Sequence, residues 1–490
     1  MTTHSICPRC GRTRHDRVHR CCDTADVRRV VEGTPGAGRA LAALRTVGRP
    51  LVVGGLVRDA LLRAAGHLVP EAPSDVDIEL HTGVGLDAVV ALLRSTGASV
   101  VTAGARFEVL RVVIDDTHLD VAVAPWQPDQ DAGFRQAASR RDFTLDAVAW
   151  DPAADVLLDA FGGIDDAAAG ILRHTSDRFG EDPLRVLRAV QLVARFALTV
   201  HPDTIAVARS LSDRFDEVVT DRVWPEIRRL ASGDHITLAL DVLHRTDWER
   251  HFPELAAVRD VPQDPRWHPE GAVHIHLGLA GDAAARACTE DGMTGEDRVV
   301  VVLAAILHDV GKAGRGTQLV HQGGTTRIRS IGHERSGAVA ARALLGRVGA
   351  PRSTTERIAL LVREHMVVHS TASGGPSVSA ARRLLRRLGG SLAVAEQWAR
   401  VCDADTRGRG SASTGSPAAA WIDVMRRDAA SGRPSRLLTG RDLVDAGLRP
   451  GPVFHAVLTD AADAQDDGVF DDEAGARRWL ADRLATSDVL

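Results

Sequence analysis

The spacing of hydrophobic positions separates a mixed α/β part of the chain from a longer helical part. Strand-like apolar runs occupy Leu51–Val53, Asp75–Leu80 and residues 107–125, the last divided into two strands by an Asp-Asp turn. Helix-like spacing marks residues 27–45 and the segment LDAVVALLRSTG, and it prevails from Leu184 onwards. The pattern predicts an α+β protein, with a mixed-sheet head followed by an all-α body and a further all-α domain.

The first predicted strand runs directly into a glycine pair and a helix. Leu51–Val53 stops at Gly54-Gly55, and the helix-like segment VRDALLRAA follows. Glycines let backbone N–H groups approach a phosphate closely, and the helix dipole favours negative charge at the helix N-terminus. A glycine pair alone is usually only a turn, but this arrangement predicts an anion site.

Two carboxylates follow on the next predicted strand. Side chains two positions apart on a strand share a face, so Asp75 and Asp77 point together while Val76 and Ile78 face the core. Adjacent carboxylates repel each other unless a cation lies between them, and hard oxygen ligands favour Mg²⁺. Alone, the pair would indicate a solvated face. At this distance from the glycine turn it indicates a metal site.

The combination resembles the head domain of the class II tRNA nucleotidyltransferase and poly(A) polymerase family. The family pattern is Gly-Gly-x-Val-Arg-Asp followed by Asp-x-Asp, and the matching residues are Gly54, Gly55, Val57, Arg58, Asp59, Asp75 and Asp77. The resemblance implies that Asp75 and Asp77 are catalytic ligands of Mg²⁺. It also implies nucleotide binding by Gly54, Gly55, Arg58 and Asp59.

A third carboxylate lies on the second strand of residues 107–125. Asp120 is either a third catalytic carboxylate beside the metal site or an edge-strand charge. The segment ARFE replaces the family's Lys-Ser-Phe-Gly-like segment, and Pro125 stands near the place of a family arginine. Arg106 and Arg111 are the candidates for the missing phosphate contact.

The segment RRDFTLDA, at residues 140–147, is similar to the family motif Arg-Arg-Asp-Phe-Thr-x-Asn-Ala, with Asp146 in the place of the asparagine. Adjacent guanidinium groups suit a polyphosphate, and a neighbouring carboxylate can fix their geometry. The resemblance therefore implies nucleotide binding by Arg141 and Asp142. LLDAFGGIDD, at residues 157–166, matches the closing hairpin of the family's head.

Asp182 before Pro183 predicts the start of a helix, because aspartate caps helices and proline fits the first helical position. Arg185 and Arg188 then fall near one face of that helix. The family uses Glu-Asp-x-x-Arg here as a protein template for the incoming base, which implies nucleotide contacts by Asp182, Arg185 and Arg188. Arginine donors and aspartate acceptors together can imitate a Watson–Crick edge. The alternative is that Asp182 is a cap and Arg185 a surface residue.

A second set of chemistry-bearing residues lies between residues 267 and 409. LAAILHDVGK places His308 and Asp309 side by side and resembles the HD phosphohydrolase superfamily, whose ligands hold one or two divalent metals. The implied ligands of the HD metal are His276, His308, Asp309, His333, His365 and Asp405. His274 competes with the first of these and Asp403 with the last. A histidine-rich set suits a transition metal such as Ni²⁺, Co²⁺ or Mn²⁺.

Four of the six cysteines fall in the first 22 residues, within CPRCGRTRHDRVHRCC. Such clustering in an intracellular chain favours metal over disulfide. The spacing Cys-x2-Cys-x4-His-x5-Cys is one residue longer than a zinc knuckle, and it predicts Zn²⁺ ligands at Cys7, Cys10, His15 and Cys21. His19 and Cys22 are spare ligands. The arginines of this segment make RNA contact one role for it, and a small structural clip is the other.

Composition limits the remaining choices. The formal net charge is −5, so an RNA site must be a local basic patch. No apolar run is long enough to span a bilayer, and MTTHSICPRC lacks the apolar segment of a signal peptide, so a cytoplasmic protein without a membrane partner is expected.

Lys312, the only lysine, follows the His-Asp pair and indicates a need for a compact ammonium there. The basic segment ARRLLRRLGG is either a solvated face or an RNA contact.

These features predict five segments: a zinc-knuckle-like module (1–26), a nucleotidyltransferase head (27–165), a helical body for base selection and RNA binding (166–265), an HD phosphohydrolase domain (266–410), and a linker with a helical tail (411–490). By resemblance, the protein adds CMP and AMP from CTP and ATP to tRNA 3′ ends, which is CCA addition or repair. The alternatives are an A-only or poly(A)-type tailing enzyme, and an HD phosphohydrolase whose head has become an RNA-binding module.

Overall fold

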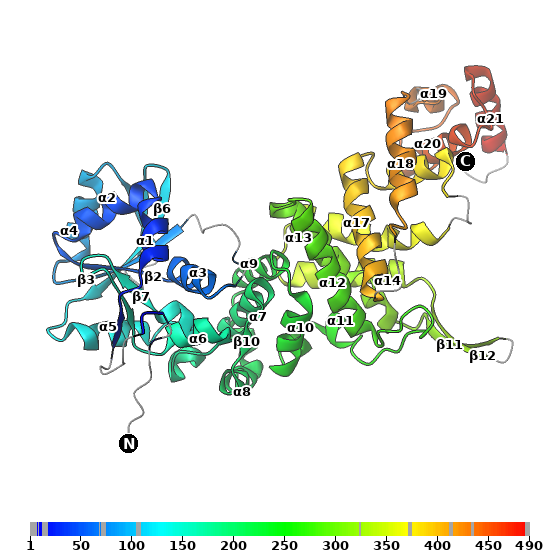
Figure 1. Ribbon diagram of the computed structural model, residues 1–490. Coiled ribbons are helices and arrows are strands. Elements are labelled where there is room, and N and C mark those ends of the chain that lie inside the picture. Colours follow the sequence, from blue (N-terminus) through cyan, green and yellow to red (C-terminus); the bar gives the residue numbers. More distant parts are fainter. Residues whose placement is uncertain are drawn as a thin grey trace. The chain divides into compact units, whose positions relative to one another are not determined.

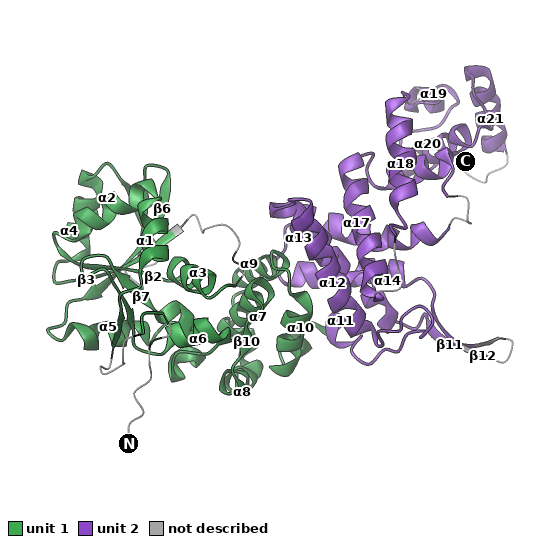
Figure 2. Cartoon of the chain, viewed as in Figure 1, with its two compact units in different colours: residues 1–253 green, residues 254–490 purple. Residues whose placement is uncertain are grey.

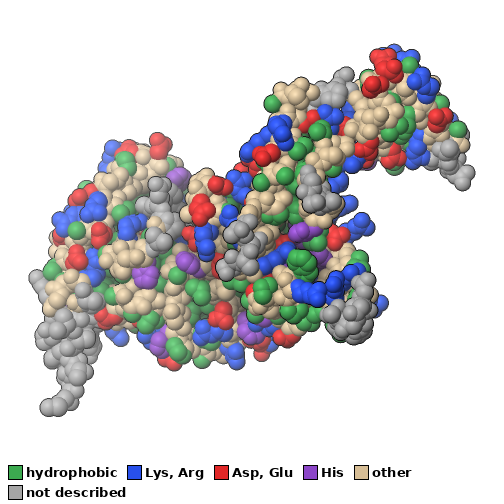
Figure 3. Space-filling model, turned by 45° about the vertical axis from the view of Figure 1, so that its right-hand side comes forward, with side chains coloured by type: hydrophobic (Ala, Val, Ile, Leu, Met, Phe, Trp, Pro, Cys, Tyr) green, Lys and Arg blue, Asp and Glu red, His purple; other side chains and the backbone are tan. Residues whose placement is uncertain are grey.

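The computed structural model describes residues 7, 9–11, 18–67, 69, 75–103, 109–322, 325–370, 375–410, 415–432 and 436–485. They divide into two compact units, Met1–Pro253 and Glu254–Leu490 (Figure 2). No helix in this described part is long and apolar enough to cross a membrane. Basic and acidic side chains are interspersed over the face shown in Figure 3, in keeping with the small net charge.

An eight-stranded mixed sheet forms the centre of the first unit, in the order β1-β8-β7-β2-β3-β6-β5-β4. Its strands β3 and β6 are parallel neighbours and the other described pairs are antiparallel. The strands are β1 (His19–Cys21), β2 (Gly48–Val53), β3 (Asp75–Thr82), β4 (Ser99–Ala103), β5 (Val109–Ile114), β6 (Thr117–Pro125), β7 (Ala149–Asp151) and β8 (Val156–Asp159). The mixed-sheet head predicted from the sequence is confirmed.

Helices surround this sheet and then form a body of their own (Figure 1). Those of the head are α1 (Ala25–Glu32), α2 (Pro35–Leu44), α3 (Gly55–Ala64), α4 (Leu86–Ser95), α5 (Gln130–Ala138), η1 (Thr144–Ala147) and α6 (Gly163–Ala169). The body contains η2 (Asp177–Glu181), α7 (Arg185–Phe196), α8 (Pro202–Ser210), η3 (Ser212–Glu217), α9 (Thr220–Ala231), α10 (Ile236–Arg245) and η4 (Glu249–His251), with the short pair β9 (Ile171–Leu172) and β10 (Thr199–Val200). Helix α7 packs against both α9 and α10.

The strand pair predicted within residues 107–125 is confirmed. Strands β5 and β6 form an antiparallel hairpin whose turn residues, Asp115 and Asp116, have φ angles of 50° and 58°. Left-handed conformations at both central residues are typical of a tight hairpin turn, and aspartate tolerates them better than most residues do. The turn sets the register of β6 and therefore the position of Asp120.

Two helix boundaries differ from those predicted. Residues 27–45 form two helices, α1 and α2, because Pro35 lacks a backbone N–H and begins the second helix at its first turn. Helix α7 begins at Arg185 and not at Asp182-Pro183. The Asp182 carboxylate accepts a hydrogen bond from the Leu184 N–H at 3.1 Å, so it closes a turn just before the helix.

The second unit is built around α13 (Gly295–Leu307), in which every residue from Arg298 to Leu307 is buried. Its other helices are α12 (Val273–Glu290), η5 (Val310–Ala313), α14 (His333–Arg347), α15 (Arg352–Glu364), η6 (His365–Ser370), α16 (Val378–Arg387), α17 (Leu392–Gly408), α18 (Ala419–Ala430), α19 (Gly440–Asp445), α20 (Pro452–Asp466) and α21 (Glu473–Ala485), while α11 (Pro253–Ala256) lies at the division between the units. A two-stranded hairpin, β11 (Thr317–Gln322) and β12 (Thr325–Ser330), interrupts the helices. Its alternating sequence was a strand signal that the all-helical prediction passed over.

The arginines of the basic helix α16 are paired with carboxylates of neighbouring helices. Arg382 and Arg386 both contact Asp466, a carboxylate at the end of α20 whose side chain is only 1% exposed. Arg383 lies 2.5 Å from Asp467, and Arg387 lies 2.8 Å from Glu364. Arg382, Arg383 and Arg386 therefore join α16 to the tail, and RNA contact by this helix stays a prediction.

Asp466→Ala is expected to lower the free energy of unfolding of the second unit by about 3 kcal/mol, because it removes the buried carboxylate that Arg382, Arg386 and Arg436 share. Asp467→Ala is the matched control. Its carboxylate is 46% exposed, so its loss should cost at most about 1 kcal/mol. Denaturant unfolding of the full chain measures both values, and equal values would mean that the buried pairs do not hold the tail.

Candidate functional site

The turn between β2 and α3 brings a glycine against a carboxylate of the next strand. Gly54 has a φ of +75°, and a Cβ atom at this position would lie 2.4 Å from Asp77 Oδ2. Only glycine combines this backbone conformation with so close an approach. The site therefore places the Asp77 carboxylate directly beside the N-terminus of α3, where backbone N–H groups favour an anion.

The sheet register brings two further charged residues of the head, Asp120 and Arg111, into line with Asp77. Asp75 is the first residue of β3, two positions earlier. Asp77 is opposite Asp120 on β6, and Asp120 is opposite Arg111 on β5. Residues opposite each other on neighbouring strands share a face of the sheet. Asp120 is therefore a neighbour of Asp77, and Arg111 is the arginine at this face, whereas Arg106 lies outside the described residues.

Arg58 and Asp59 are directed into the protein. They are 7% and 2% exposed, and Arg58 donates hydrogen bonds of 2.8 Å to both Asp59 and Asp146. This network ties α3 to η1, so the pair holds the glycine turn in position. Among the described residues, Asp146 Oδ2 has no hydrogen-bond partner, and burial raises the pKa of Asp146. A protonated Asp146 would be close in shape and polarity to the asparagine of the family motif.

The RRDFT segment supplies two further ion pairs. Arg188 of α7 donates to the Asp142 carboxylate and, although burial opposes it, lowers the pKa of Asp142. Arg141 donates to Glu79 Oε2 at 3.1 Å, and His81 Nε2 lies 2.8 Å from Glu79 Oε1. Despite the opposing effect of burial, these two partners lower the pKa of Glu79.

Glu79 and His81 were not identified from the sequence. They continue the face of β3 that carries Asp77, and with Arg141 they line a cavity of about 320 Å³. The alternation that singled out Asp75 and Asp77 extends to both residues, so the signal was present. Their partner in the RRDFT segment was not visible from the sequence.

The residues predicted to select the base lie at the start of α7. Arg185 donates to the backbone carbonyls of Arg178 at 2.6 Å and Arg140 at 2.5 Å. Arg222 of α9 donates to Asp182 Oδ2 at 2.6 Å. Arg185 and Asp182 are thus each held by a second segment of the chain, and Arg222 is a partner that the sequence did not reveal.

Six buried side chains converge in the second unit. Each comes from a different helix or helix end, except for the adjacent His308 and Asp309. The residues are His276, His308, Asp309, His333, His365 and Asp405. The rival residues lie outside this cluster, because His274 Nδ1 contacts the Arg259 carbonyl and Asp403 accepts a hydrogen bond from Ser416.

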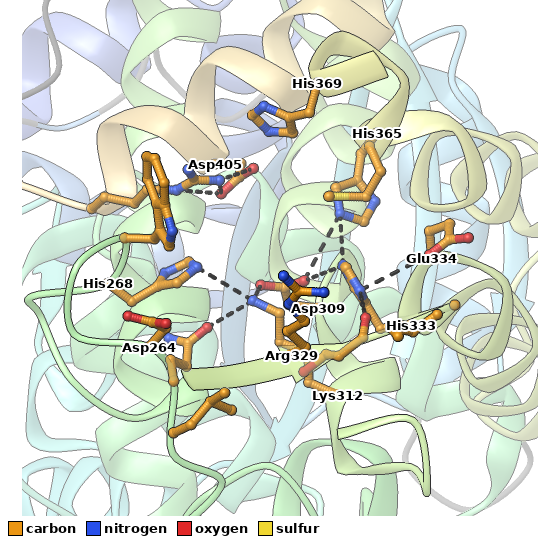
Figure 4. Close-up of a pocket in the computed structure, with 18 residues that line it drawn as sticks. Asp264, His268, Asp309, Lys312, Arg329, His333, Glu334, His365, His369 and Asp405 are labelled. Atoms are coloured by element: carbon orange, nitrogen blue, oxygen red, sulfur yellow. Dashed lines mark hydrogen bonds and ion pairs between the residues drawn. The ribbon is translucent and has the colours of Figure 1, made fainter. Parts of the chain in front are cut away.

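The cluster contains two overlapping groups of ligands that share Asp309. His276 Nε2 lies 3.2 Å from His308 Nε2, and Asp309 Oδ2 lies 3.3 Å from His308 Nε2. On the other side, His333 Nε2 lies 3.3 Å from His365 Nε2 and 3.1 Å from Asp309 Oδ1. Figure 4 shows Asp309 between Lys312 and His333, with His365 beside them. The arrangement offers two positions for a divalent cation, bridged by one carboxylate.

The orientation of the histidines fits a metal. The Nδ1 atoms of His308, His333 and His365 lie 2.8, 2.6 and 2.6 Å from backbone carbonyl oxygens three residues earlier. A carbonyl oxygen only accepts, so each Nδ1 carries a hydrogen and donates it. The Nε2 atoms are thereby turned towards the centre, as in histidines that coordinate metals.

The histidines of the cluster also differ in pKa. Although burial opposes it, the carboxylates of Asp309 and Asp405 raise the pKa of His308 to about 10. Burial and the neighbouring His308 lower the pKa of His365 to about 3. A divalent cation would compete with the proton on His308, because both are attracted by the same carboxylates.

Cationic and aromatic side chains line the cavity of about 650 Å³ in front of this cluster. Lys312 Nζ lies 2.5 Å from Asp309 Oδ2 and donates to Gln263 at 2.8 Å. Arg329 of β12 and Trp267 also line the cavity, and Trp267 is 67% exposed. The cavity thus combines metal ligands, positive charge and one open aromatic face.

Two residues that support the metal-ligand cluster, Glu270 and His268, were not identified from the sequence. Glu270 Oε1 lies 2.8 Å from the Nδ1 atoms of both His268 and His276. Glu270 and His268 occur in the loop segment HPEG, which carries no motif that would have identified them.

A separate group of ligand atoms lies at the N-terminus and belongs to Cys7, Cys10, His19 and Cys21. The predicted ligand His15 lies outside the described residues, and His19, considered only as a spare, is the histidine in this group. His19 and Cys21 belong to β1 of the head's sheet. The second half of the predicted module, from Val18 onwards, therefore lies against the head's sheet.

Comparisons with known proteins agree with this architecture. The Poly A polymerase head domain family matches residues 51–173, and the HD domain family matches residues 268–405. The chain is thus a nucleotidyltransferase with a poly(A) polymerase-type head and an HD domain. A multifunctional CCA protein of Stenotrophomonas maltophilia (strain K279a) is 32% identical over 380 residues, which cover 73% of this chain and 86% of the relative. The chain belongs to the family of the multifunctional CCA proteins.

Solved structures share the fold over nearly the whole chain. A CCA-adding enzyme in complex with CTP has a TM-score of 0.60 and 16% identity, covering 96% of this chain and all of that chain. The Thermotoga maritima CCA-adding enzyme complexed with tRNA has a TM-score of 0.54 and 17% identity, covering 94% of this chain and 98% of its own. These identities are low, so the likeness concerns the fold.

Proposed function

We propose that the protein adds CMP and AMP, from CTP and ATP, to the 3′ ends of tRNA and releases pyrophosphate. The observation that carries this proposal is the contact between the Gly54 turn and the Asp77 carboxylate. It joins an anion-binding helix N-terminus to an acidic, oxygen-only metal site, which is what transfer from a nucleoside triphosphate requires.

Each part of the head would have a separate role. Asp75, Asp77 and Asp120 are the carboxylates that would hold Mg²⁺, whose hard-ligand preference they fit. When bound there, Mg²⁺ neutralises charge on the triphosphate and makes the attacking ribose hydroxyl more acidic. The backbone N–H groups after Gly54 would receive the phosphates. Arg58 keeps that turn in place through its contacts with Asp59 and Asp146.

The relatives support the choice of substrate. The matched relative is called a multifunctional CCA protein, and structures of the same fold were determined as complexes of CCA-adding enzymes with CTP, with ATP and with tRNA. The low net charge does not oppose RNA binding, because an RNA site needs only a local group of basic residues.

Base selection is assigned to Asp182 and Arg185. Arg185→Ala removes a guanidinium group that would exchange its bonds to the Arg178 and Arg140 carbonyls for the edges of C and A. Discrimination against UTP and GTP should therefore fall by roughly 1–3 kcal/mol, by analogy with bidentate base contacts. Incorporation of each of the four nucleotides is the measurement. Arg209→Ala is a matched control, because this exposed arginine of α8 also donates to a backbone carbonyl. If the Arg185 variant selects as the wild type does, Arg185 only holds the Arg178 and Arg140 carbonyls and does not select the base.

We also propose that the HD domain is a metal-dependent phosphohydrolase acting on phosphate or cyclic phosphate groups at RNA 3′ ends. A metal held by the histidines would supply an activated water molecule. Lys312 and Arg329 would bind the phosphate, and the exposed face of Trp267 suits a nucleobase. Removal of such a group exposes the hydroxyl that the head needs, which explains why the two units are joined.

Incubation with tRNA lacking its CCA end and with each labelled nucleotide tests the proposal against its alternatives. CCA addition requires incorporation from both CTP and ATP. Incorporation of AMP alone would instead identify an A-only or poly(A)-type tailing enzyme. No incorporation, together with phosphatase activity, would identify an HD phosphohydrolase with an RNA-binding head.

A further inference from the structure

Three sulfur atoms and one imidazole nitrogen meet at the N-terminus, before the part of the chain that matches the head family. Those of Cys7, Cys10, His19 and Cys21 all lie within 4.8 Å of one another. A tetrahedral ion with bonds of about 2.3 Å to sulfur and about 2.0 Å to nitrogen holds its ligand atoms about 3.5–3.8 Å apart. Only small movements are needed to close the group around an ion.

One pair of ligands comes from a tight turn. The Gly11 N–H donates to the Cys7 carbonyl at 2.9 Å, and Gly11 has a φ of +67°, which brings the chain back on itself directly after Cys10. The side chain of Arg9 is 10% exposed and lies 3.3 Å from the Asp23 carboxylate. It also donates to the Asp23 carbonyl at 3.2 Å. The turn is therefore already fixed to the segment just before α1.

The second pair of ligands belongs to the head's sheet. His19 and Cys21 lie two positions apart on β1 and are both buried, while Arg20 between them is exposed. Strand β1 pairs with β8, with His19 opposite Asp159. The preceding Val18, 1% exposed, belongs to the core cluster that contains Leu51 of β2. The ligand group thus joins a turn to the edge of a sheet.

We propose that Cys7, Cys10, His19 and Cys21 bind one structural Zn²⁺ ion, which holds the turn at Cys7–Cys10 against β1, the edge strand of the head's sheet. Three thiolates and one imidazole form a complete tetrahedral set with no position left for water or substrate, as in structural zinc sites. A disulfide would use two of the three cysteines and leave the third sulfur and the imidazole facing it. Because Val18 packs under β2, the ion stabilises the strand that leads into the Gly54 turn.

Cys22 provides an internal control. It follows the last ligand directly, but it is exposed and is not part of the group. A variant with Cys22→Ser removes a thiol from the same segment and should keep the ion.

The test compares the full-length wild type, the double variant Cys7→Ser/Cys10→Ser and Cys22→Ser, all purified without chelator. The zinc content of the double variant should be lower by about one ion per chain, and that of Cys22→Ser should equal the wild type. The difference between variants excludes any metal held by the HD domain, which all three share. The melting temperature of the double variant should fall by several degrees, because binding energy at a structural site contributes to folding.

Substitution with Co²⁺ keeps the proposal testable if the double variant does not fold. The wild type and Cys22→Ser should show the absorption bands of tetrahedral cobalt bound by thiolates, which the HD cluster, with its nitrogen and oxygen ligands, cannot produce. Absence of these bands in the wild type would overturn the proposal. Equal zinc contents in all three proteins, or a disulfide between two of the three cysteines, would also overturn it.

Discussion

Asp77→Asn is expected to lower nucleotide addition by at least about 10³-fold while the head stays folded. A metal held at this position contributes several kcal/mol of charge stabilisation, and each 1.4 kcal/mol corresponds to a factor of ten. The amide has the size of the carboxylate, so it should fit against Gly54, but it lacks the charge that holds the ion. Its neutrality should also relieve repulsion from Asp120, the neighbour on β6.

The measurement is the rate of CMP incorporation into tRNA lacking its CCA end, with the melting temperature as a control for folding. Asp116→Asn is the matched substitution. It removes one carboxylate from the exposed turn of the hairpin that carries Asp120, and asparagine accepts the left-handed conformation found there. Its activity should stay within about twofold of the wild type, since exposed surface charges contribute little. Equal rates for Asp77→Asn and the wild type would mean that Asp77 and the head do not catalyse nucleotide addition.

Asp309→Asn should abolish the phosphohydrolase activity and leave CCA addition within about twofold of the wild type. Asp309 lies in both ligand groups of the HD cluster, so its charge serves both cation positions. The loss should reach about 10³-fold, because the metal that activates water loses its shared ligand. The two proposed sites lie in different compact units of the chain, so the activities should be separable.

Both assays are made on one preparation of the variant, with a 2′,3′-cyclic nucleotide and with tRNA lacking its CCA end. Asp403→Asn is the control, because Asp403 is on the same helix as Asp405 but binds Ser416 and lies outside the cluster. It should retain both activities. Equal loss of both activities in Asp309→Asn would mean that the HD cluster stabilises the chain and does not catalyse a reaction.

The features that the sequence predicted well are local ones. The alternation on β3 and the two aspartates of the β5–β6 turn each depend on a few adjacent residues, and backbone geometry determines them. The position of Asp120 followed from the same local register once the parallel pairing of β3 and β6 formed. The motif residues of the head could therefore be located before the fold was known.

The contacts between distant segments could not be predicted in this way. Arg222 lies 40 residues from its partner Asp182, and nothing in the spacing of either residue selects the other. The choice of His19 at the N-terminus depends on the pairing of β1 with β8, which the cysteine spacing does not contain. The α16 arginines illustrate the same limit, since a basic stripe does not reveal which carboxylates it will meet.

The order of nucleotide addition tests the central claim most directly. A tRNA trimmed to the nucleotide before its CCA end is incubated with CTP alone, with ATP alone and with both, and the products are separated by length. We expect two added residues with CTP alone, a third when ATP is also present, and none with UTP or GTP. Extension by a run of A residues, or no extension under any of these conditions, would contradict the account.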